Sequence, residues 1–192
     1  MLQTRIQTII KESVQVKQAI LADAALIALI EEVTMVCVRA FEQDKQILFG
    51  GNGGSAADAQ HLAAEFSGRF YKDRDPLNAE ALHVNTSYLT AVANDYSYDQ
   101  IYSRIIKAKG KTGDVLFGIS TSGNSSNIVH ALEQAKKQGM ITIGLTGQGG
   151  GKMQAICDYT IQVPSQDTPR IQEAHITIGH IICELVEANL FQ

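Results

Sequence analysis

Short apolar runs alternate with longer helical stretches from residue 46 to the end of this 192-residue chain. Strands are expected at 46–51, 79–84, 114–120, 140–146 and 159–163. Helices are expected at 55–70, 87–93, 98–109, 125–138 and 169–190. Alternation of this kind is typical of a parallel sheet with helices on both faces. Two of the runs, VLFGIS and ITIGL, are almost wholly apolar, as buried central strands should be. We therefore expect an α/β fold built on a five-stranded parallel sheet.

The segment before this alternation is purely helical in character. Apolar side chains recur at helical spacing in residues 1–43, and residues 1–49 contain neither glycine nor proline. Two helices are expected, with a break near Asp23. Their apolar surface exceeds what one short helix can cover, so it should pack on another subunit or on the chain's own sheet. We interpret 1–192 as one domain, with helices for subunit packing at 1–43 and an α/β core at 44–192.

Charge and composition argue against several classes of partner. The formal net charge is −4 and the basic residues are scattered, which is untypical of a nucleic-acid surface. No apolar run approaches the ~20 residues of a membrane helix, and the N-terminus lacks a signal-peptide pattern. Three cysteines without a CxxC motif indicate reduced thiols. We expect a cytoplasmic protein with no nucleic-acid and no membrane partner.

Glycine and hydroxyl residues gather where the expected strands end. The segments read GGNGGS, STSGNSS, TGQGGG and PSQDTPR. In open α/β sheets the ligand lies beyond the carboxyl ends of the strands. Loops of this composition let the backbone approach a phosphate and offer it N–H groups. The carboxyl edge of the sheet is therefore the expected ligand site.

The first of these loops matches the dinucleotide pattern G-x-G-x-x-A over residues 51–56. That pattern needs an acid at the end of the second strand to hold the ribose, and here the strand ends Val84-Asn85-Thr86. A nucleotide cofactor is therefore disfavoured. A structural loop and a sugar-binding loop both remain open, and we favour the sugar-binding loop.

The second loop carries four hydroxyl groups, on Ser120, Thr121, Ser122 and Ser125, just before an expected helix. Hydroxyls at a helix N-terminus suit a phosphate group. The Walker lysine is absent, which disfavours ATP. A plain N-cap at Ser125 with a turn would explain Ser125 and Asn124, but not the three preceding hydroxyls.

One helical pair suits metal binding or proton transfer. His61 and Glu65 are four residues apart and so share one helix face. Gln172 and His180 lie eight apart on the last helix, about 80° around its axis and roughly 12 Å along it. Both would have to reach inward to share one metal with His61 and Glu65, which is possible but stretched. His175 is interpreted as structural.

Five motifs together resemble those of the phosphoheptose isomerases, which are sugar isomerase (SIS) domain proteins. The motifs are GGNGGSAADAQHLAAEFSGRF, AVANDYSYD, GISTSGNSSN, LTGQGGGKM and RIQEAHITIGH, in that order. The resemblance covers nearly the whole chain, including the helical N-terminus. It implies a flavodoxin-like SIS fold, a cytoplasmic homotetramer and dependence on one zinc ion per subunit.

The implied reaction converts sedoheptulose 7-phosphate to D-glycero-D-manno-heptose 7-phosphate, the entry to ADP-heptose for lipopolysaccharide core. The implied metal ligands are His61, Glu65, Gln172 and His180. The implied substrate residues are Asn52, Gly53, Gly54, Glu65, Asn94, Asp95, Ser120, Thr121, Ser122, Ser125 and Gln172. Ser55 and Arg69 of the first motif complete the substrate-binding residues that we expect.

Glu65 is the expected base at carbon, and His180 the expected acid or proton shuttle. The chain departs from the family at Pro169, where some members carry an acid. Any contact from that acid is either missing or supplied by Asp167 or Thr168.

A related branch of the family contains a tetrameric regulator that binds the bacterial replication initiator and has no catalytic role. The glycine and serine loops resemble that branch too. The branch lacks the acid at the position of Glu65, so Glu65 and His180 favour the enzyme. A sugar-phosphate-sensing regulator is a third, weaker alternative, because no DNA-binding segment is attached.

Overall fold

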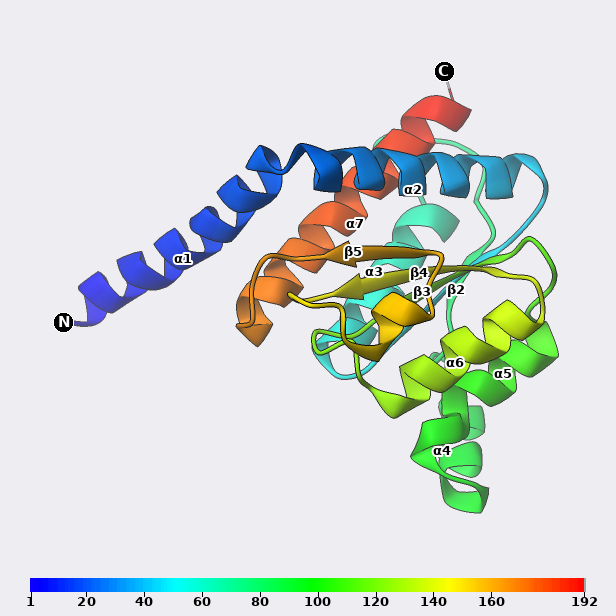
Figure 1. The fold of residues 1–192 in the computed structure, drawn as a ribbon. Coiled ribbons are helices and arrows are strands. Elements are labelled where there is room, and N and C mark those ends of the chain that lie inside the picture. The colour runs from blue at the N-terminus through cyan, green and yellow to red at the C-terminus, as the bar shows by residue number, and fades with distance from the viewer. Residues whose placement is uncertain (192) are drawn as a thin grey trace.

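The computed structural model describes residues 1–191, and within them five parallel strands form one sheet in the order β2-β1-β3-β4-β5 (Figure 1). The strands are β1 Ile47–Gly51, β2 Ala79–Ala81, β3 Val115–Ile119, β4 Ile141–Thr146 and β5 Tyr159–Gln162. The chain passes from β1 to β2 on one side and then returns to place β3 on the other side of β1. This flavodoxin-like order puts a switch point between β1 and β3, where ligands bind in such sheets. The predicted fold class is confirmed.

Helices cover both faces of the sheet. One face carries α2 Ala24–Glu42, α3 Gly54–Ser67 and α7 Thr168–Leu190. The other carries α4 Thr86–Asp95, α5 Ile101–Lys109 and α6 Ser126–Lys137. Short 3₁₀ turns lie at Tyr98–Gln100 and Gly151–Ala155.

Side-chain alternation along the strands builds a separate core on each face. In β1, Ile47 and Phe49 face the α2–α3–α7 side, while Leu48 faces the α5–α6 side. In β3, Phe117 faces the α2–α3–α7 side and Leu116 faces the α5–α6 side. All five side chains are almost completely buried, so the sheet is apolar on both faces, as a parallel sheet requires.

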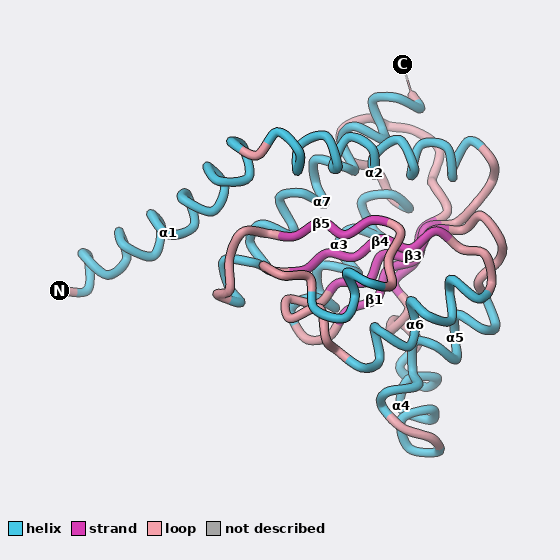
Figure 2. The backbone as a smooth tube through the Cα atoms, viewed as in Figure 1, coloured by secondary structure: helices cyan, strands magenta, loops and turns pink. Residues whose placement is uncertain are grey.

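The N-terminal helices break at the predicted position. Helix α1, Leu2–Ala22, ends before Asp23, whose carboxylate caps α2 by accepting a hydrogen bond from the N–H of Leu26 at 3.0 Å. Helix α2 packs on the chain's own sheet and on α7, whereas α1 stands out from the body (Figures 1 and 2).

Strand β2 is shorter than the predicted 79–84. It lies at the sheet edge and pairs only with β1, over Ala79–Ala81. The chain then turns away, with the N–H of Val84 bonded to the carbonyl of Ala81 at 3.4 Å. Helix α3 also ends earlier than predicted, at Ser67. Among the helices of residues 1–191, none is both long and apolar enough to cross a membrane.

Candidate active site

His61, Glu65 and His180 form a cluster where α3 and α7 lie side by side. His61 Nε2 is 3.1 Å from Glu65 Oε1 and 3.4 Å from His180 Nε2. Gly179, next to His180, permits this close approach, because a Cβ there would lie 2.5 Å from Cδ2 of Leu62. The i,i+4 pair predicted on α3 is thus joined by a residue 119 positions away on α7.

The three donor atoms fit a metal ion. One ligand atom from each residue lies within 4.8 Å of the others. Zinc bonds nitrogen and oxygen at about 2.0–2.1 Å, so neighbouring ligands of a tetrahedral zinc lie about 3.3 Å apart, close to the two spacings that His61 makes with Glu65 and His180. Two imidazoles and one carboxylate are also a donor set used by catalytic zinc.

The surroundings of the cluster are partly open to solvent. The side chain of His61 is 48% exposed and that of Glu65 is 24% exposed. Asp58, one turn before His61 on α3, is partly buried, and this burial raises its carboxyl pKa while the nearby His61 opposes the rise. The donor atoms of the cluster can therefore be reached from solvent.

Gln172 lies elsewhere on α7. A Cβ on Gly54, at the start of α3, would lie 2.5 Å from Gln172 Nε2. Gly54 precedes His61 by seven residues, or about 10 Å along the helix. In this arrangement Gln172 stands beside the first glycine loop, and three of the four expected ligands meet without it.

The first glycine loop is tied to α6 through an amide pair. Nδ2 of Asn52 donates to Oδ1 of Asn127 at 2.8 Å, and Nδ2 of Asn127 donates to Oδ1 of Asn52 at 2.8 Å. The hydroxyl of Tyr98 also donates to Oδ1 of Asn52, at 3.0 Å. One N–H of Asn52 then remains for a ligand.

Two of these partners were not singled out from the sequence. Asn127 is 2% exposed, but at the start of α6 it resembles an ordinary capping residue. Tyr98 belongs to the motif AVANDYSYD, and membership of that motif was the sequence feature that could have identified it.

The hydroxyls of the second loop gather around Ser120. Its Oγ lies 2.9 Å from Ser125 Oγ and 3.4 Å from Ser122 Oγ. Ser125 stands at the N-cap position of α6, with its hydroxyl turned to Ser120, so the plain N-cap interpretation does not describe it. Gly123 has φ +64°, and a Cβ there would collide with the carbonyl of Gly150. The loop after β4 therefore lies directly against the loop after β3.

Thr121 borders a cavity of ≈ 210 Å³ beside this hydroxyl loop. Its other polar lining residues are Ser122, Gln148, Ser165, Gln166 and Thr168. The loops after β3, β4 and β5 therefore contribute to one polar hollow at the carboxyl edge of the sheet.

Other predicted residues lie on projecting or exposed segments. Asn94 and Asp95 end α4, which projects below the body in Figure 1, and Asn94 Nδ2 donates to Asp95 Oδ1 at 3.0 Å. Arg69 is exposed in the loop after α3. Gly53 is exposed at the N-cap position of α3 with φ +56°, whereas Ser55, in the first turn of the helix, is buried.

His175 belongs to the core. It is fully buried, with Nε2 3.1 Å from the carbonyl of Thr146 at the end of β4. Burial lowers its pKa to about 4, so the imidazole is neutral near pH 7.

The chain is similar to a known domain family and to curated proteins over most of its length. The family model described as SIS domain matches residues 10–147. A phosphoheptose isomerase of Aneurinibacillus thermoaerophilus is 56% identical over 97% of this chain and 94% of its own length. One of Clostridium acetobutylicum is 52% identical over 97% of this chain and 95% of its own length.

Solved structures with a similar fold carry the same name as these relatives. A phosphoheptose isomerase from Neisseria gonorrhoeae superposes with a TM-score of 0.91 at 41% identity, covering 98% of this chain and 100% of its own. One from Francisella tularensis gives a TM-score of 0.93 at 34% identity, covering 98% and 99%.

Proposed function

The chain belongs to the SIS domain family and within it to the phosphoheptose isomerases, and we propose that it converts sedoheptulose 7-phosphate into D-glycero-D-manno-heptose 7-phosphate. One observation carries the proposal: an acid–base cluster at His61, Glu65 and His180 lies apart from a hydroxyl loop around Ser120. A 7-phosphorylated sugar has its reacting carbons and its phosphate at opposite ends. Two separated regions of this chemistry suit such a substrate.

The reaction moves a proton between C1 and C2 through an enediol. Glu65 takes the proton from carbon, since its carboxylate has one oxygen 3.1 Å from His61 and a second oxygen for the substrate. His180 exchanges protons with the substrate oxygens. The phosphate end is held by the hydroxyl loop, which fixes C1 and C2 near Glu65.

His61, Glu65 and His180 would hold one zinc ion per subunit, with Gln172 as the proposed fourth ligand. A bound zinc ion would polarise the substrate carbonyl and its neighbouring hydroxyl. The Gln172 side chain would have to turn from Gly54 toward the cluster to serve as a ligand. In its present place it suits its other proposed role, contact with the substrate.

Turnover tests the proposed function directly. Wild-type protein with zinc should convert sedoheptulose 7-phosphate and incorporate solvent deuterium at C2 of the product, because the proton removed from C1 of the ketose exchanges with water before a proton is delivered to C2. Nuclear magnetic resonance follows both events. A folded, zinc-loaded protein without turnover would contradict the proposal.

The phosphate end gives a second prediction. Replacing both Ser122 and Ser125 by alanine should raise KM for the sugar phosphate by one to two orders of magnitude, from lost hydrogen bonds worth roughly 1–3 kcal/mol. Ser103→Ala is a matched control, because Ser103 lies on α5 and bonds the carbonyl of Gln100. A double variant with the KM of wild type would place the phosphate elsewhere.

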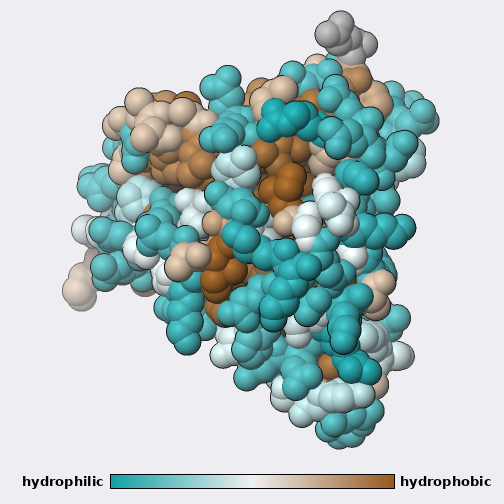
Figure 3. All heavy atoms as spheres, turned by 45° about the vertical axis from the view of Figure 1, so that its right-hand side comes forward, coloured by the Kyte–Doolittle hydropathy of each residue, from teal (hydrophilic) through white to brown (hydrophobic). Residues whose placement is uncertain are grey.

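The proposed assembly is a homotetramer. On α1, Leu2, Ile6, Ile10 and Val14 recur every four residues and are 46% to 78% exposed. Apolar patches also interrupt the hydrophilic surface in the upper half of Figure 3. Burying such side chains between subunits is favourable. Light scattering at micromolar concentration should give the mass of four chains, and a stable monomer would contradict the proposal.

We place the enzyme in the cytoplasm, where its product would feed ADP-heptose synthesis for lipopolysaccharide core. Its three cysteines, all within the described residues, are unpaired, as expected of a reducing compartment. The scattered charge gives no support for a nucleic-acid partner.

A further inference from the structure

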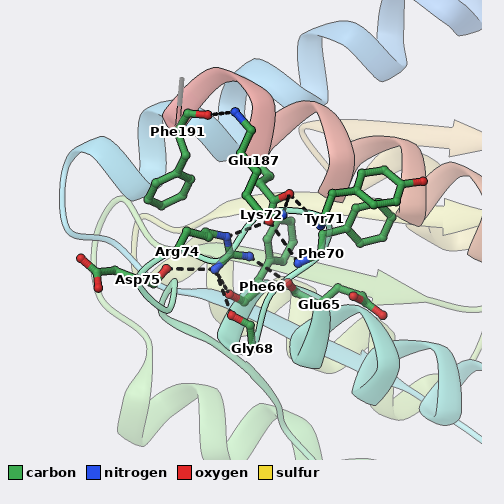
Figure 4. A network of polar contacts seen from close by, with 10 residues as sticks. All are labelled: Glu65, Phe66, Gly68, Phe70, Tyr71, Lys72, Arg74, Asp75, Glu187 and Phe191. Carbon is green, nitrogen blue, oxygen red and sulfur yellow. Dashed lines mark hydrogen bonds and ion pairs between the residues drawn. The ribbon is translucent and has the colours of Figure 1, made fainter.

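A buried ion pair closes the loop that follows α3. Nε of Arg74 lies 3.0 Å from Oε2 of Glu187, near the end of α7. The two side chains are 2% and 3% exposed. Figure 4 shows the pair at the centre of a network that joins the end of α3, the loop of residues 68–75 and α7.

Glu187 is fully occupied by donors. Oε2 accepts from the N–H of Phe70 at 3.0 Å as well as from Arg74, and Oε1 accepts from the N–H groups of Tyr71 and Lys72, each at 2.8 Å. Burial opposes ionisation of Glu187, but these donors outweigh it and lower its pKa. The carboxylate therefore holds three consecutive loop residues.

Arg74 holds the end of α3 in the same manner. Nη2 donates to the carbonyl of Glu65 at 2.9 Å. Nη1 donates to the carbonyls of Phe66, Gly68 and Asp75 at 2.8, 3.2 and 3.0 Å. The carbonyls in the last turn of a helix lack intrahelical partners, and a positive charge there also complements the helix dipole.

Both parts of the network lead to the His61–Glu65–His180 cluster. Arg74 fixes the backbone of Glu65. Glu187 fixes the backbone of Phe70, whose ring centroid lies 5.7 Å from that of His180. The ion pair thus reaches Glu65 through the main chain and His180 through an aromatic contact, without touching the donor atoms of either.

We infer that the Arg74–Glu187 pair is a positioning element that sets the Glu65 carboxylate and the His180 imidazole at metal-binding spacing. The inference rests on the proposed function for the roles of Glu65 and His180. A buried ion pair is a costly way to close a loop, since removing two charges from water offsets much of their attraction. A planar guanidinium and a carboxylate that accepts four hydrogen bonds do, however, fix the orientation of the groups that they bind, which apolar packing does not.

Glu187→Gln is the first test. Its amide keeps one oxygen for two of the four donors, but its NH₂ faces the other two. If Phe70 and Arg74 lose their acceptor, the dissociation constant for Zn²⁺, measured on metal-free protein with a competing chelator, should rise about 10–100-fold. The kcat of the zinc-saturated enzyme should fall by a similar factor, while KM for the sugar phosphate stays within about threefold.

Phe70→Leu is the second variant and tests the contact to His180 alone. It removes the ring but keeps the N–H bonded to Glu187, so the loop should remain closed and the protein folded. We expect a smaller rise in the Zn²⁺ dissociation constant, about 3–10-fold, of the kind that follows loss of a supporting contact. The absorption spectrum of the Co²⁺-substituted protein should shift, since it reports ligand geometry.

Ile106→Val is the matched control for lost stability. Ile106 is fully buried on α5, on the other side of the sheet. It should lower the melting temperature without changing Zn²⁺ affinity or kcat. If Glu187→Gln and Phe70→Leu fold and show wild-type Zn²⁺ affinity and Co²⁺ spectra, the pair is only a loop anchor and the inference is overturned.

The metal measurements separate this inference from the proposed function. Weakened Zn²⁺ binding in both variants, with an inactive wild type, would support positioning of the cluster and reject the isomerase. An active wild type with unaltered variants would keep the isomerase and reject the positioning role.

Discussion

Replacing Glu65 by glutamine should lower kcat by roughly 10²–10⁴-fold, the usual worth of a positioned general base. The change is nearly isosteric and keeps an oxygen for the contact that Glu65 Oε1 now makes with His61 Nε2 at 3.1 Å. It removes the negative charge and replaces the second oxygen, the proposed base, by an NH₂ group that cannot accept a proton. The effect should therefore fall on kcat, with little change in KM or melting temperature, and deuterium exchange at C2 should slow to the same extent.

Two companion variants sharpen this result. Glu133→Gln changes an exposed carboxylate on α6 and should leave kcat unaltered. His180→Gln should resemble Glu65→Gln in its loss of kcat, because proton exchange at the substrate oxygens is lost instead of proton removal at carbon. Turnover that persists in Glu65→Gln would keep the enzyme and move the base to another residue.

Local patterns predicted most of the architecture. The alternation of apolar runs and helical stretches led to the five parallel strands, and Asp23 marked the break between α1 and α2. Each of these features depends on residues close together in the sequence. The length of β2 was overestimated because the chain turns away from β1 after Ala81, although β1 itself continues to Gly51, and such a departure is a tertiary property.

In the candidate site too, features that depend on neighbouring residues were predicted more directly than those that depend on tertiary packing. The spacing of His61 and Glu65 is a helix property and could be read directly. Their approach to His180 depends on the packing of α3 against α7. Helix geometry alone showed that this approach was feasible, and the family resemblance suggested that it occurs. The Arg74–Glu187 pair joins residues 113 positions apart and gave no pattern in the sequence.

Loss of His61 should have the largest effect on metal content. Wild-type protein should hold about one zinc per chain after dialysis, as measured by elemental analysis. His61→Ala should hold far less, because the imidazole lies within 3.4 Å of both other donor atoms and no neighbouring ligand replaces it in the cluster shown. His130→Ala is the control, since His130 Nδ1 lies 3.3 Å from the carbonyl of Asp99, on the other face of the sheet.

Gln172→Ala then decides how the metal site is completed. If Gln172 is the fourth ligand, its loss should also weaken zinc binding, and its side chain must leave Gly54 when zinc binds. If zinc content is kept and only KM for the sugar phosphate rises, Gln172 contacts the substrate from its place beside the glycine loop, and the fourth position on zinc is open to water or substrate, as in catalytic zinc sites. Protein refolded in saturating zinc that retains none of it would exclude both arrangements and the cluster's role as a zinc site.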